Sequence, residues 1–347
     1  MTKICQVEIN GESFVARQGE LLLDAALMNG IDLPHDCRSG YCGTCRVRVL
    51  SGHTFGGAST DPGVVHACQC RIVSDLAIAV DEMPETMETQ GQLRELNRIA
   101  PDVFEVAVET AEPLTHLPGQ YVNFQFRGFP ARHYSPTAPL DAAQPRDPNL
   151  LRFHIRVLPR GRVSSALGNR IKAGHRVKLT GPYGSATFRP RNASRLVLVA
   201  SGTGFAPIWA VADAAIREWP ERELVLIAAA RSLASLYMIP ALCQLARLPR
   251  AMITLVSSMR QNFTRAVRFG RPTDYLPPLR SDDLVYVAGA PPMVAAVSDI
   301  AAAAEATCLA DPFEPAGEDE GPTLLARAAE WFSRGSAPRT DITRFSS

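Results

Sequence analysis

The chain has 347 residues, which predicts two or three domains because a domain usually contains about 100 to 200 residues. Hydrophobic residues make up 46% of the chain and charged residues 20%, and 36 Lys and Arg against 35 Asp and Glu give a formal net charge of +1. This profile is typical of a globular protein and disfavours a nucleic-acid binder or a polybasic membrane-surface protein. The sequence shows neither a secretory signal nor a run of about 18 apolar residues, so we expect a cytoplasmic protein without a membrane span.

Residues 1–82 are expected to form one small domain. Polar and apolar side chains alternate over 4–17 around Asn10 and Gly11, which predicts a β-hairpin. A short helix is predicted over 21–28, and further strands over 46–50 and 77–80. Residues 83–95 carry several charges, little apolar content and no period, so we expect a linker there.

The rest of the chain divides into two differently patterned regions and a tail. Alternating segments at 104–108, 121–126, 153–157 and 177–179 predict a small antiparallel β-barrel over 96–190. Strands and helices alternate over 191–313, which predicts a parallel sheet covered by helices. Residues 314–347 are expected to form a flexible extension with a short amphipathic helix over 324–333. The expected fold class is therefore multidomain, α+β and α/β.

Cysteines are concentrated near the start, where six of the eight lie within the first 70 residues. Because cytosolic thiols stay reduced, such clustered cysteines are expected to bind metal and not to form disulfides. Cys37, Cys42 and Cys45 have the C-x4-C-x2-C spacing of a plant-type [2Fe-2S] site, with a fourth ligand further along the chain. Gly40 and Gly43 let backbone N–H groups approach the sulfides of such a cluster.

The fourth ligand is either Cys68 or Cys70. A structural zinc site is the alternative, since four thiolates also suit zinc, but zinc sites usually consist of two C-x2-C pairs. The spacing therefore favours iron and sulfide. Cys5 lies in the predicted hairpin and is expected to be a buried apolar side chain.

Two segments of the predicted barrel point to a flavin. Arg132, Tyr134 and Ser135 are residue types that can pair with a diphosphate, cover an isoalloxazine face and hydrogen-bond near the N5 atom. Gly161 begins a predicted helix whose N–H groups can hold the flavin pyrophosphate. Each segment alone is a weak signal, but together with the motif that follows they form a coherent set.

The α/β region contains a glycine-rich turn between a buried strand and a helix. At Gly202, Thr203 and Gly204, backbone N–H groups and the helix N-terminus can hold a diphosphate. The turn departs from the G-x-G-x-x-G fingerprint, so we expect the dinucleotide to sit differently from that of a dehydrogenase. Arg231 follows the next strand, where the adenosine ribose is expected.

Taken in order, these motifs resemble a known family. Residues 35–47 and 67–70 resemble the ferredoxin domain of oxygenase reductases, which implies a β-grasp fold. The flavin and nucleotide segments are similar to the ferredoxin-NADP reductase superfamily. Residues 310–313 resemble the terminal A-D-x-F element of naphthalene-dioxygenase-type reductases.

The resemblance implies a set of site residues. It makes Cys37, Cys42, Cys45 and Cys68 the cluster ligands and leaves Cys70 as a non-ligand. The implied flavin contacts, with Tyr134 and Ser135 beside the reacting atoms, are Arg132, Tyr134, Ser135, His154, Ile155, Arg156, Gly161, Val163 and Ser164. The implied nucleotide contacts are Gly202, Thr203, Gly204, Pro207, Arg231, Gly289, Pro291 and Met293, with Phe313 near the flavin.

The chain departs from the family in two places. Only 22 residues separate Cys45 from Cys68, so the loop that covers the cluster is expected to be short. Ala288 stands where the superfamily usually has a cysteine near the transferred hydride. We therefore expect hydride transfer to depend on positioning and not on a thiol.

The resemblance implies the reductase component of a multicomponent, aromatic ring-hydroxylating oxygenase. Electrons are expected to pass from NADH to FAD, singly to the [2Fe-2S] cluster, and on to a Rieske-type ferredoxin or the terminal oxygenase. NADPH is an alternative donor, and we expect a monomer that binds neither nucleic acid nor membrane. The alternatives are the same electron path serving a di-iron monooxygenase or a deoxysugar dehydratase, and a zinc-stabilised binding module without redox activity.

Overall fold

A computed structural model describes residues 3–35, 38, 40, 44–58, 63–80, 84–141, 146–188, 195–260 and 266–313. Cys37, Cys42 and the tail over 314–347 with its expected helix lie outside the described residues. The expected domain boundaries near residues 82 and 190 also lie outside them and stay predictions. Below, residues up to 80 are called the N-terminal region, 84–188 the middle region and 195–313 the C-terminal region.

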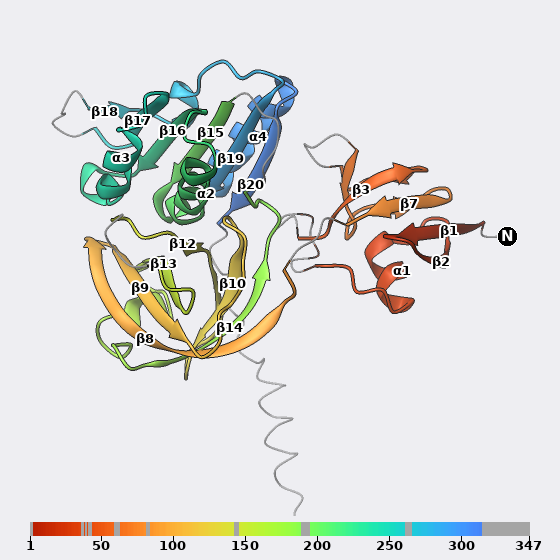
Figure 1. Cartoon of the computed structure of the whole chain (residues 1–347), viewed down its shortest axis with the longest axis horizontal. Helices are drawn as coiled ribbons and strands as arrows, with labels where there is room; N and C mark the ends of the chain where they lie inside the picture. Colours follow the sequence, from red (N-terminus) through yellow and green to blue (C-terminus); the bar gives the residue numbers. More distant parts are fainter. Residues whose placement is uncertain are drawn as a thin grey trace, which may run out of the picture. The chain divides into compact units, whose positions relative to one another are not determined.

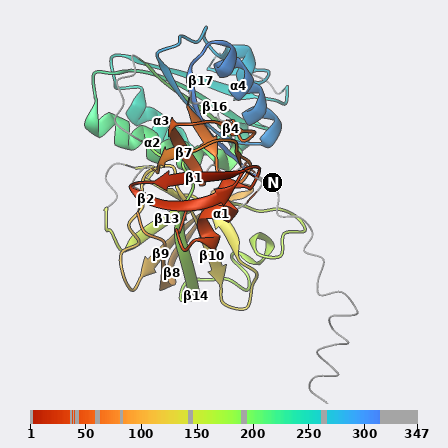
Figure 2. The same cartoon turned by 90° about the vertical axis from the view of Figure 1, so that its right-hand side faces the viewer.

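The N-terminal region is a mixed sheet with one helix. Its elements are β1 (Ile4–Ile9), β2 (Glu12–Arg17), α1 (Leu22–Met28), β3 (Arg46–Ser51), β4 (Thr54–Phe55), β5 (Val64–His66), β6 (Arg71–Ile72) and β7 (Leu76–Ala79). The main sheet has the order β2-β1-β7-β3-β5, with β1 parallel to β7, while β4 and β6 form a separate pair. The predicted hairpin is confirmed, and Asn10 and Gly11 supply the positive φ angles of its turn, 49° and 91°. α1 lies beside this hairpin (Figure 2), and its Leu22 and Leu23 are fully buried in the shared core.

The middle region is a seven-stranded antiparallel sheet that curls around an apolar core (Figure 1). Its strands are β8 (Met87–Ala100), β9 (Val103–Thr110), β10 (Tyr121–Phe126), β11 (Arg132–Tyr134), β12 (Pro136–Thr137), β13 (Leu150–Arg156) and β14 (Arg176–Tyr183). They lie in the order β11-β10-β14-β8-β9-β13-β12. Phe124, Phe126 and Phe153 belong to its core. The expected antiparallel architecture is confirmed.

Residues 87–95, expected to be part of a linker, instead form the first part of β8, which pairs with β14 and β9. The prediction missed this strand because one of its buried positions is polar, which hides the alternation of polar and apolar residues. Thr89 is 4% exposed and Leu93 is 0% exposed. At Gly91 a Cβ atom would lie 2.5 Å from the Glu109 carbonyl oxygen, so the lack of a side chain at Gly91 allows β9 to lie this close to β8. A strand held by two neighbours can form without a strong apolar period.

The C-terminal region is a six-stranded parallel sheet with helices on both faces (Figure 1). Its elements are β15 (Arg195–Ser201), α2 (Phe205–Glu218), β16 (Glu223–Ala230), α3 (Ile239–Leu245), β17 (Ala251–Ser257), β18 (Val267–Phe269), β19 (Asp283–Gly289), α4 (Pro291–Ala303) and β20 (Thr307–Pro312). α2 and α3 pack on one face, and α4 packs on the other. The strand order β18-β17-β16-β15-β19-β20 reverses beside β15, and in such sheets ligands bind at the reversal, beyond the carboxyl ends of the strands.

Buried polar contacts join the middle and C-terminal regions. The Trp209 indole N–H donates to the Pro139 carbonyl at 2.9 Å, and the Tyr286 hydroxyl donates to the Thr187 carbonyl at 2.9 Å. The Thr137 hydroxyl donates to the Ala206 carbonyl, in the first turn of α2, at 2.8 Å. These contacts hold the reversal point of the parallel sheet against the curled sheet. Within the described ranges, no helix has the length and apolar character needed to cross a bilayer.

Candidate functional site

The N-terminal region brings together the segments that carry Cys45 and Cys68, which are 3% and 4% exposed. The Ala67 N–H donates to the Cys45 carbonyl at 2.9 Å. The Gln69 side-chain amide donates to the Arg38 carbonyl at 2.8 Å, which ties the two segments together a second time. Two of the four expected cluster ligands are thus close in the fold, while Cys37 and Cys42 lie outside the described residues.

Cys5 and Cys70 are core side chains of the same region. Both are 0% exposed and belong to one apolar cluster, which confirms the expected burial of Cys5. Burial, and secondly the charge of Cys68, raise the pKa of the Cys70 thiol to about 12. Cys70 therefore packs as a small apolar residue.

The loop over residues 37–45, called the cysteine-rich loop below, is joined to the middle region by a hydrogen bond of Thr44. The Gly184 N–H donates to the Thr44 hydroxyl oxygen at 3.1 Å, and Thr44 directly precedes Cys45. Gly184 directly follows β14, and its carbonyl accepts from the buried Gln120 amide at 3.4 Å. An expected cluster ligand therefore lies one residue from a contact with the curled sheet.

Arg132 and Tyr134 belong to β11, and Ser135 follows it. The Tyr134 and Phe124 rings meet edge-on with centroids 5.7 Å apart. Burial raises the pKa of Tyr134 to about 12, although the Arg132 charge opposes this shift. A neutral phenol and an arginine on one short strand suit the ring face and the diphosphate of a flavin.

The second expected flavin segment is a closed loop and not a helix. The Leu158 N–H donates to the Ser164 hydroxyl oxygen at 3.0 Å. The predicted helix is wrong, because only a 3-10 turn, Ser164–Ala166, forms before Leu167 becomes extended at ψ 132°. At Gly161 a Cβ atom would lie 2.3 Å from the Ser164 hydroxyl oxygen, so glycine permits the tight loop.

The remaining expected flavin contacts have different environments. Ile155 and Val163 are buried in the core of the curled sheet. The Arg156 guanidinium, on the exposed side, pairs with the Asp102 carboxylate at 3.0 Å. His154 is buried against the C-terminal region.

The expected nucleotide contacts gather at the reversal point of the parallel sheet, where Gly202–Gly204 forms a 3-10 turn between β15 and α2. At Gly204 a Cβ atom would lie 2.3 Å from the Ala288 carbonyl oxygen, and at Gly289 one would lie 2.3 Å from the Ser201 hydroxyl oxygen. The ends of β15 and β19 therefore touch through glycine backbone. The first turn of α2 has no side-chain cap and no acidic residue, which suits an anion at its N–H groups. The other expected nucleotide contacts at these carboxyl ends are Pro207, Arg231, Pro291 and Met293. Phe313, expected near the flavin, lies here too, and its N–H donates to the Gly289 carbonyl at 2.7 Å.

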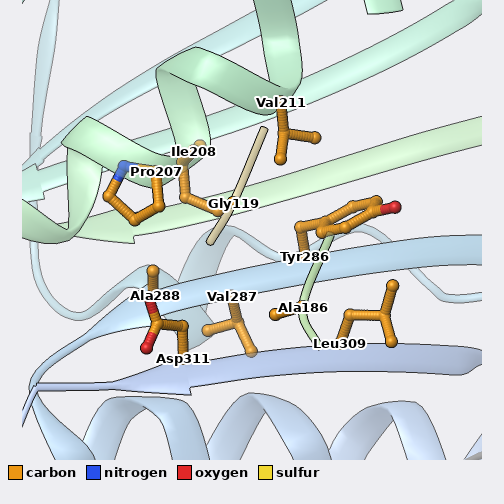
Figure 3. Close-up of a pocket in the computed structure, with 10 residues that line it drawn as sticks. All are labelled: Gly119, Ala186, Pro207, Ile208, Val211, Tyr286, Val287, Ala288, Leu309 and Asp311. Atoms are coloured by element: carbon orange, nitrogen blue, oxygen red, sulfur yellow. The ribbon is translucent and has the colours of Figure 1, made fainter. Parts of the chain in front are cut away.

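A small pocket lies at the same place, lined by residues of α2, β19 and β20 together with Gly119 and Ala186 of the middle region (Figure 3). Figure 3 shows the Asp311 carboxyl beside Ala288, its partner in the β19–β20 register. Asp311 Oδ2 is buried and has no hydrogen-bond partner among the described residues. Burial raises the pKa of this carboxyl to about 7. A buried carboxyl oxygen without a partner is a group that a ligand can satisfy.

The raised pKa of Asp311 predicts a pH-dependent stability difference. Between its ordinary pKa of 3.8 and about 7, the folded protein binds more protons at this group than the unfolded chain, so the free energy of unfolding falls as pH rises. Asp311→Asn removes this pH-dependent decrease in the free energy of unfolding. We expect the melting temperature of the cofactor-free variant, relative to wild type, to increase from about pH 5 to about pH 8. Asp282→Asn, at an exposed position, is the matched control, and a difference for Asp311→Asn that does not change with pH would contradict the assignment.

Three residues of this arrangement were not assigned a role from sequence: Thr44, Tyr237 and Asp311. Asp311 lies within the 310–313 segment, but its place opposite Ala288 follows only from strand register. Thr44 and Tyr237 contact residues 140 and 83 positions away, so local sequence carries no signal for either.

Three domain families match the chain in the order of its three regions. Residues 6–73 match the 2Fe-2S iron-sulfur cluster binding domain. Residues 90–188 match the oxidoreductase FAD-binding domain, and residues 198–299 match the oxidoreductase NAD-binding domain.

Similar proteins span most of this chain. The reductase component of the naphthalene 1,2-dioxygenase/salicylate 5-hydroxylase systems of Ralstonia sp. is 30% identical over 303 residues, 82% of this chain and 89% of that protein. The toluate 1,2-dioxygenase electron transfer component of Pseudomonas putida is 32% identical over 309 residues, 82% of this chain and 88% of that protein. The crystal structure of the Amycolatopsis cytochrome P450 reductase GcoB has a TM-score of 0.65 at 29% identity, covering 90% of this chain and 100% of that one. The ferredoxin reductase in carbazole 1,9a-dioxygenase, at 24% identity and TM-score 0.60, has the same fold over 90% of this chain and 99% of that one.

Proposed function

The chain belongs to the reductase components of multicomponent oxygenases, and on this premise we propose that it supplies electrons from NADH to a Rieske-type ferredoxin or a terminal oxygenase that hydroxylates an aromatic ring. When bound, FAD accepts two electrons as a hydride from NADH and releases them singly, and a [2Fe-2S] cluster carries one electron at a time. One observation carries the proposal: the three regions contact one another in the order of the electron path. The cysteine-rich loop is hydrogen-bonded to the middle region, and the middle region packs on the parallel sheet.

The residues of the curled sheet fit a flavin. Arg132 is proposed to pair with its diphosphate, Tyr134 to lie along the ring and Ser135 to hydrogen-bond near N5. The loop closed by the hydrogen bond from the Leu158 N–H to the Ser164 hydroxyl is proposed to bind the pyrophosphate through its backbone N–H groups. Cys68 is proposed to join Cys37, Cys42 and Cys45 as a cluster ligand, because the family resemblance implies it and because Cys70 is the more deeply buried of the two, at 0% exposed against 4% for Cys68.

The reversal point of the parallel sheet fits the dinucleotide. The backbone N–H groups of the Gly202–Gly204 turn, which leads into α2, are proposed to hold its diphosphate, and the exposed Arg231 to lie by the adenosine ribose. The nicotinamide is proposed to lie beside Ala288 and Asp311, where the Asp311 carboxyl supplies the polar contact. We propose NADH and not NADPH as the donor. We also propose a cytoplasmic location, where thiols stay reduced, and a monomer that does not bind nucleic acid.

Arg132→Ala is expected to weaken FAD binding about tenfold to a hundredfold, because a charge-assisted hydrogen bond to the diphosphate is lost. Flavin content is measured from the absorption spectrum after dialysis. Arg127→Ala, an exposed arginine just beyond β10, is the matched control and is expected to retain FAD. Unchanged flavin content in Arg132→Ala would remove Arg132 from the flavin site.

The electron acceptor is tested by stoichiometric transfer. The NADH-reduced protein is mixed anaerobically with a Rieske-type ferredoxin, a terminal aromatic-ring oxygenase, a di-iron monooxygenase or a deoxysugar dehydratase. We expect the Rieske-type ferredoxin or the terminal aromatic-ring oxygenase to be reduced fastest. Faster reduction of the di-iron enzyme or the dehydratase would assign the same electron path to that system.

A further inference from the structure

His154 points away from the core of the curled sheet. In β13, Phe153 and Ile155 belong to that core, and strand alternation directs His154 to the opposite face. The side chain is 0% exposed and lies against the C-terminal region. The Tyr237 hydroxyl and His154 Nδ1 are 3.2 Å apart, and the two rings meet edge-on with centroids 5.0 Å apart. His154 therefore makes a buried polar contact between the two regions.

Tyr237 links this contact to the nucleotide turn. It lies between β16 and α3, in the segment that Arg231 begins, and is 6% exposed. Its ring also meets the Phe205 ring edge-on, with centroids 6.1 Å apart. Phe205 is the first residue of α2 and directly follows Gly204. One tyrosine thus contacts both β13 and the residue behind the glycine turn.

Of the two ring nitrogens of His154, only Nδ1 has a hydrogen-bond partner among the described residues. Nε2 lies 3.9 Å from Glu105 Oε2, and the other oxygen of that carboxylate, Oε1, pairs with Arg152 at 3.3 Å. Burial lowers the pKa of His154 to about 3 and raises the pKa of Tyr237, so both are neutral at ordinary pH. An apolar residue at position 154 would fill this site without leaving a buried nitrogen unpaired. What the histidine provides, and an apolar residue would not, is the hydrogen bond with Tyr237.

We propose that His154 and Tyr237 form a latch that fixes the distance between the flavin-bearing and nucleotide-bearing regions, His154 being a positioning residue whose side chain does not hold the flavin. Any contact of residue 154 with the flavin is then made by its backbone. This inference rests on the proposed function, in which a nicotinamide and a flavin meet across the same boundary. A displacement of about 1 Å between reacting groups can lower a transfer rate about a hundredfold.

A double-mutant cycle in the holoprotein tests the latch. Tyr237→Phe removes the hydroxyl and keeps the ring, and His154→Leu removes the ring nitrogens. Each single variant is expected to keep its FAD and its affinity for NADH while NADH-driven flavin reduction slows about tenfold or more. The double variant is expected to be no slower, because both changes remove one link. Hydrogen exchange in the cofactor-free protein is expected to increase around residues 150–156 and 236–242 in every variant.

Tyr275→Phe is the matched control, because its hydroxyl donates to the Phe269 carbonyl within the C-terminal region. Loss of FAD in His154→Leu but not in Tyr237→Phe would overturn the latch and make the imidazole a flavin contact. Unchanged transfer rates, or effects that add in the double variant, would also overturn it. If wild type itself binds no FAD or is not reduced by NADH, the proposed function fails, a result distinct from failure of the latch.

Discussion

Cys45→Ser is expected to abolish NADH-driven reduction of cytochrome c while reduction of ferricyanide by the same preparation continues. We expect cytochrome c to receive its electrons from the cluster and ferricyanide to receive them directly from the flavin. Cys45 is 3% exposed, and the Ala67 N–H on its carbonyl ties it to the segment of Cys68, so a serine there is expected to remove one of two ligand sulfurs that the fold brings close together. Both activities and the iron content are measured on one preparation with equal flavin content.

Two further variants make this test specific. Cys68→Ser is expected to behave like Cys45→Ser, whereas Cys70→Ala is expected to keep the cluster, because Cys70 is the fully buried non-ligand of the proposal. Loss of iron in Cys70→Ala with retention in Cys68→Ser would make Cys70 the fourth ligand. Loss of ferricyanide reduction in Cys45→Ser with flavin retained would contradict the separation of the flavin and cluster steps.

Gly204→Ala is expected to slow NADH-driven flavin reduction by about a hundredfold or more without removing FAD. The added Cβ would lie 2.3 Å from the Ala288 carbonyl oxygen and 2.6 Å from the Gly289 nitrogen, and backbone atoms cannot turn aside as a side chain can. The turn after β15 and the end of β19 must then separate where the nicotinamide is proposed to lie. The rate of flavin reduction is measured by stopped-flow absorbance. Reduction of cytochrome c and of ferricyanide is expected to slow equally, because both depend on this step.

Gly202→Ala is the control within the same turn. A Cβ atom at Gly202 would meet nothing within 4 Å, although its φ of +56° adds some backbone strain. We therefore expect a much smaller loss of rate than in Gly204→Ala. Equal rates in Gly204→Ala and wild type would show that the contact between β15 and β19 does not position the dinucleotide.

Much of the fold could be predicted from local pattern. The hairpin around Asn10 and Gly11 has a turn signal between alternating strands, and the buried strands of the parallel sheet are continuous apolar runs. β8 could not be predicted, because Thr89 occupies an inward position and pairing on both sides holds the strand. The helix predicted after Gly161 fails because the chain is extended again at Leu167.

The candidate site was predictable where chemistry lies in one segment and not where it depends on register. Arg132, Tyr134 and Ser135 are adjacent in sequence and remain together in the fold. Asp311 meets Ala288 only through the pairing of β20 with β19. The His154 side chain meets Tyr237 because two sheets pack together, which alternation within β13 alone does not reveal.

An anaerobic absorption spectrum before and after NADH addition, with metal analysis of the same sample, tests the electron path most directly. We expect about two iron atoms and one FAD per chain, and loss of both flavin and cluster absorbance when NADH is added. About one zinc atom without iron, together with a spectrum that NADH does not change, would contradict it.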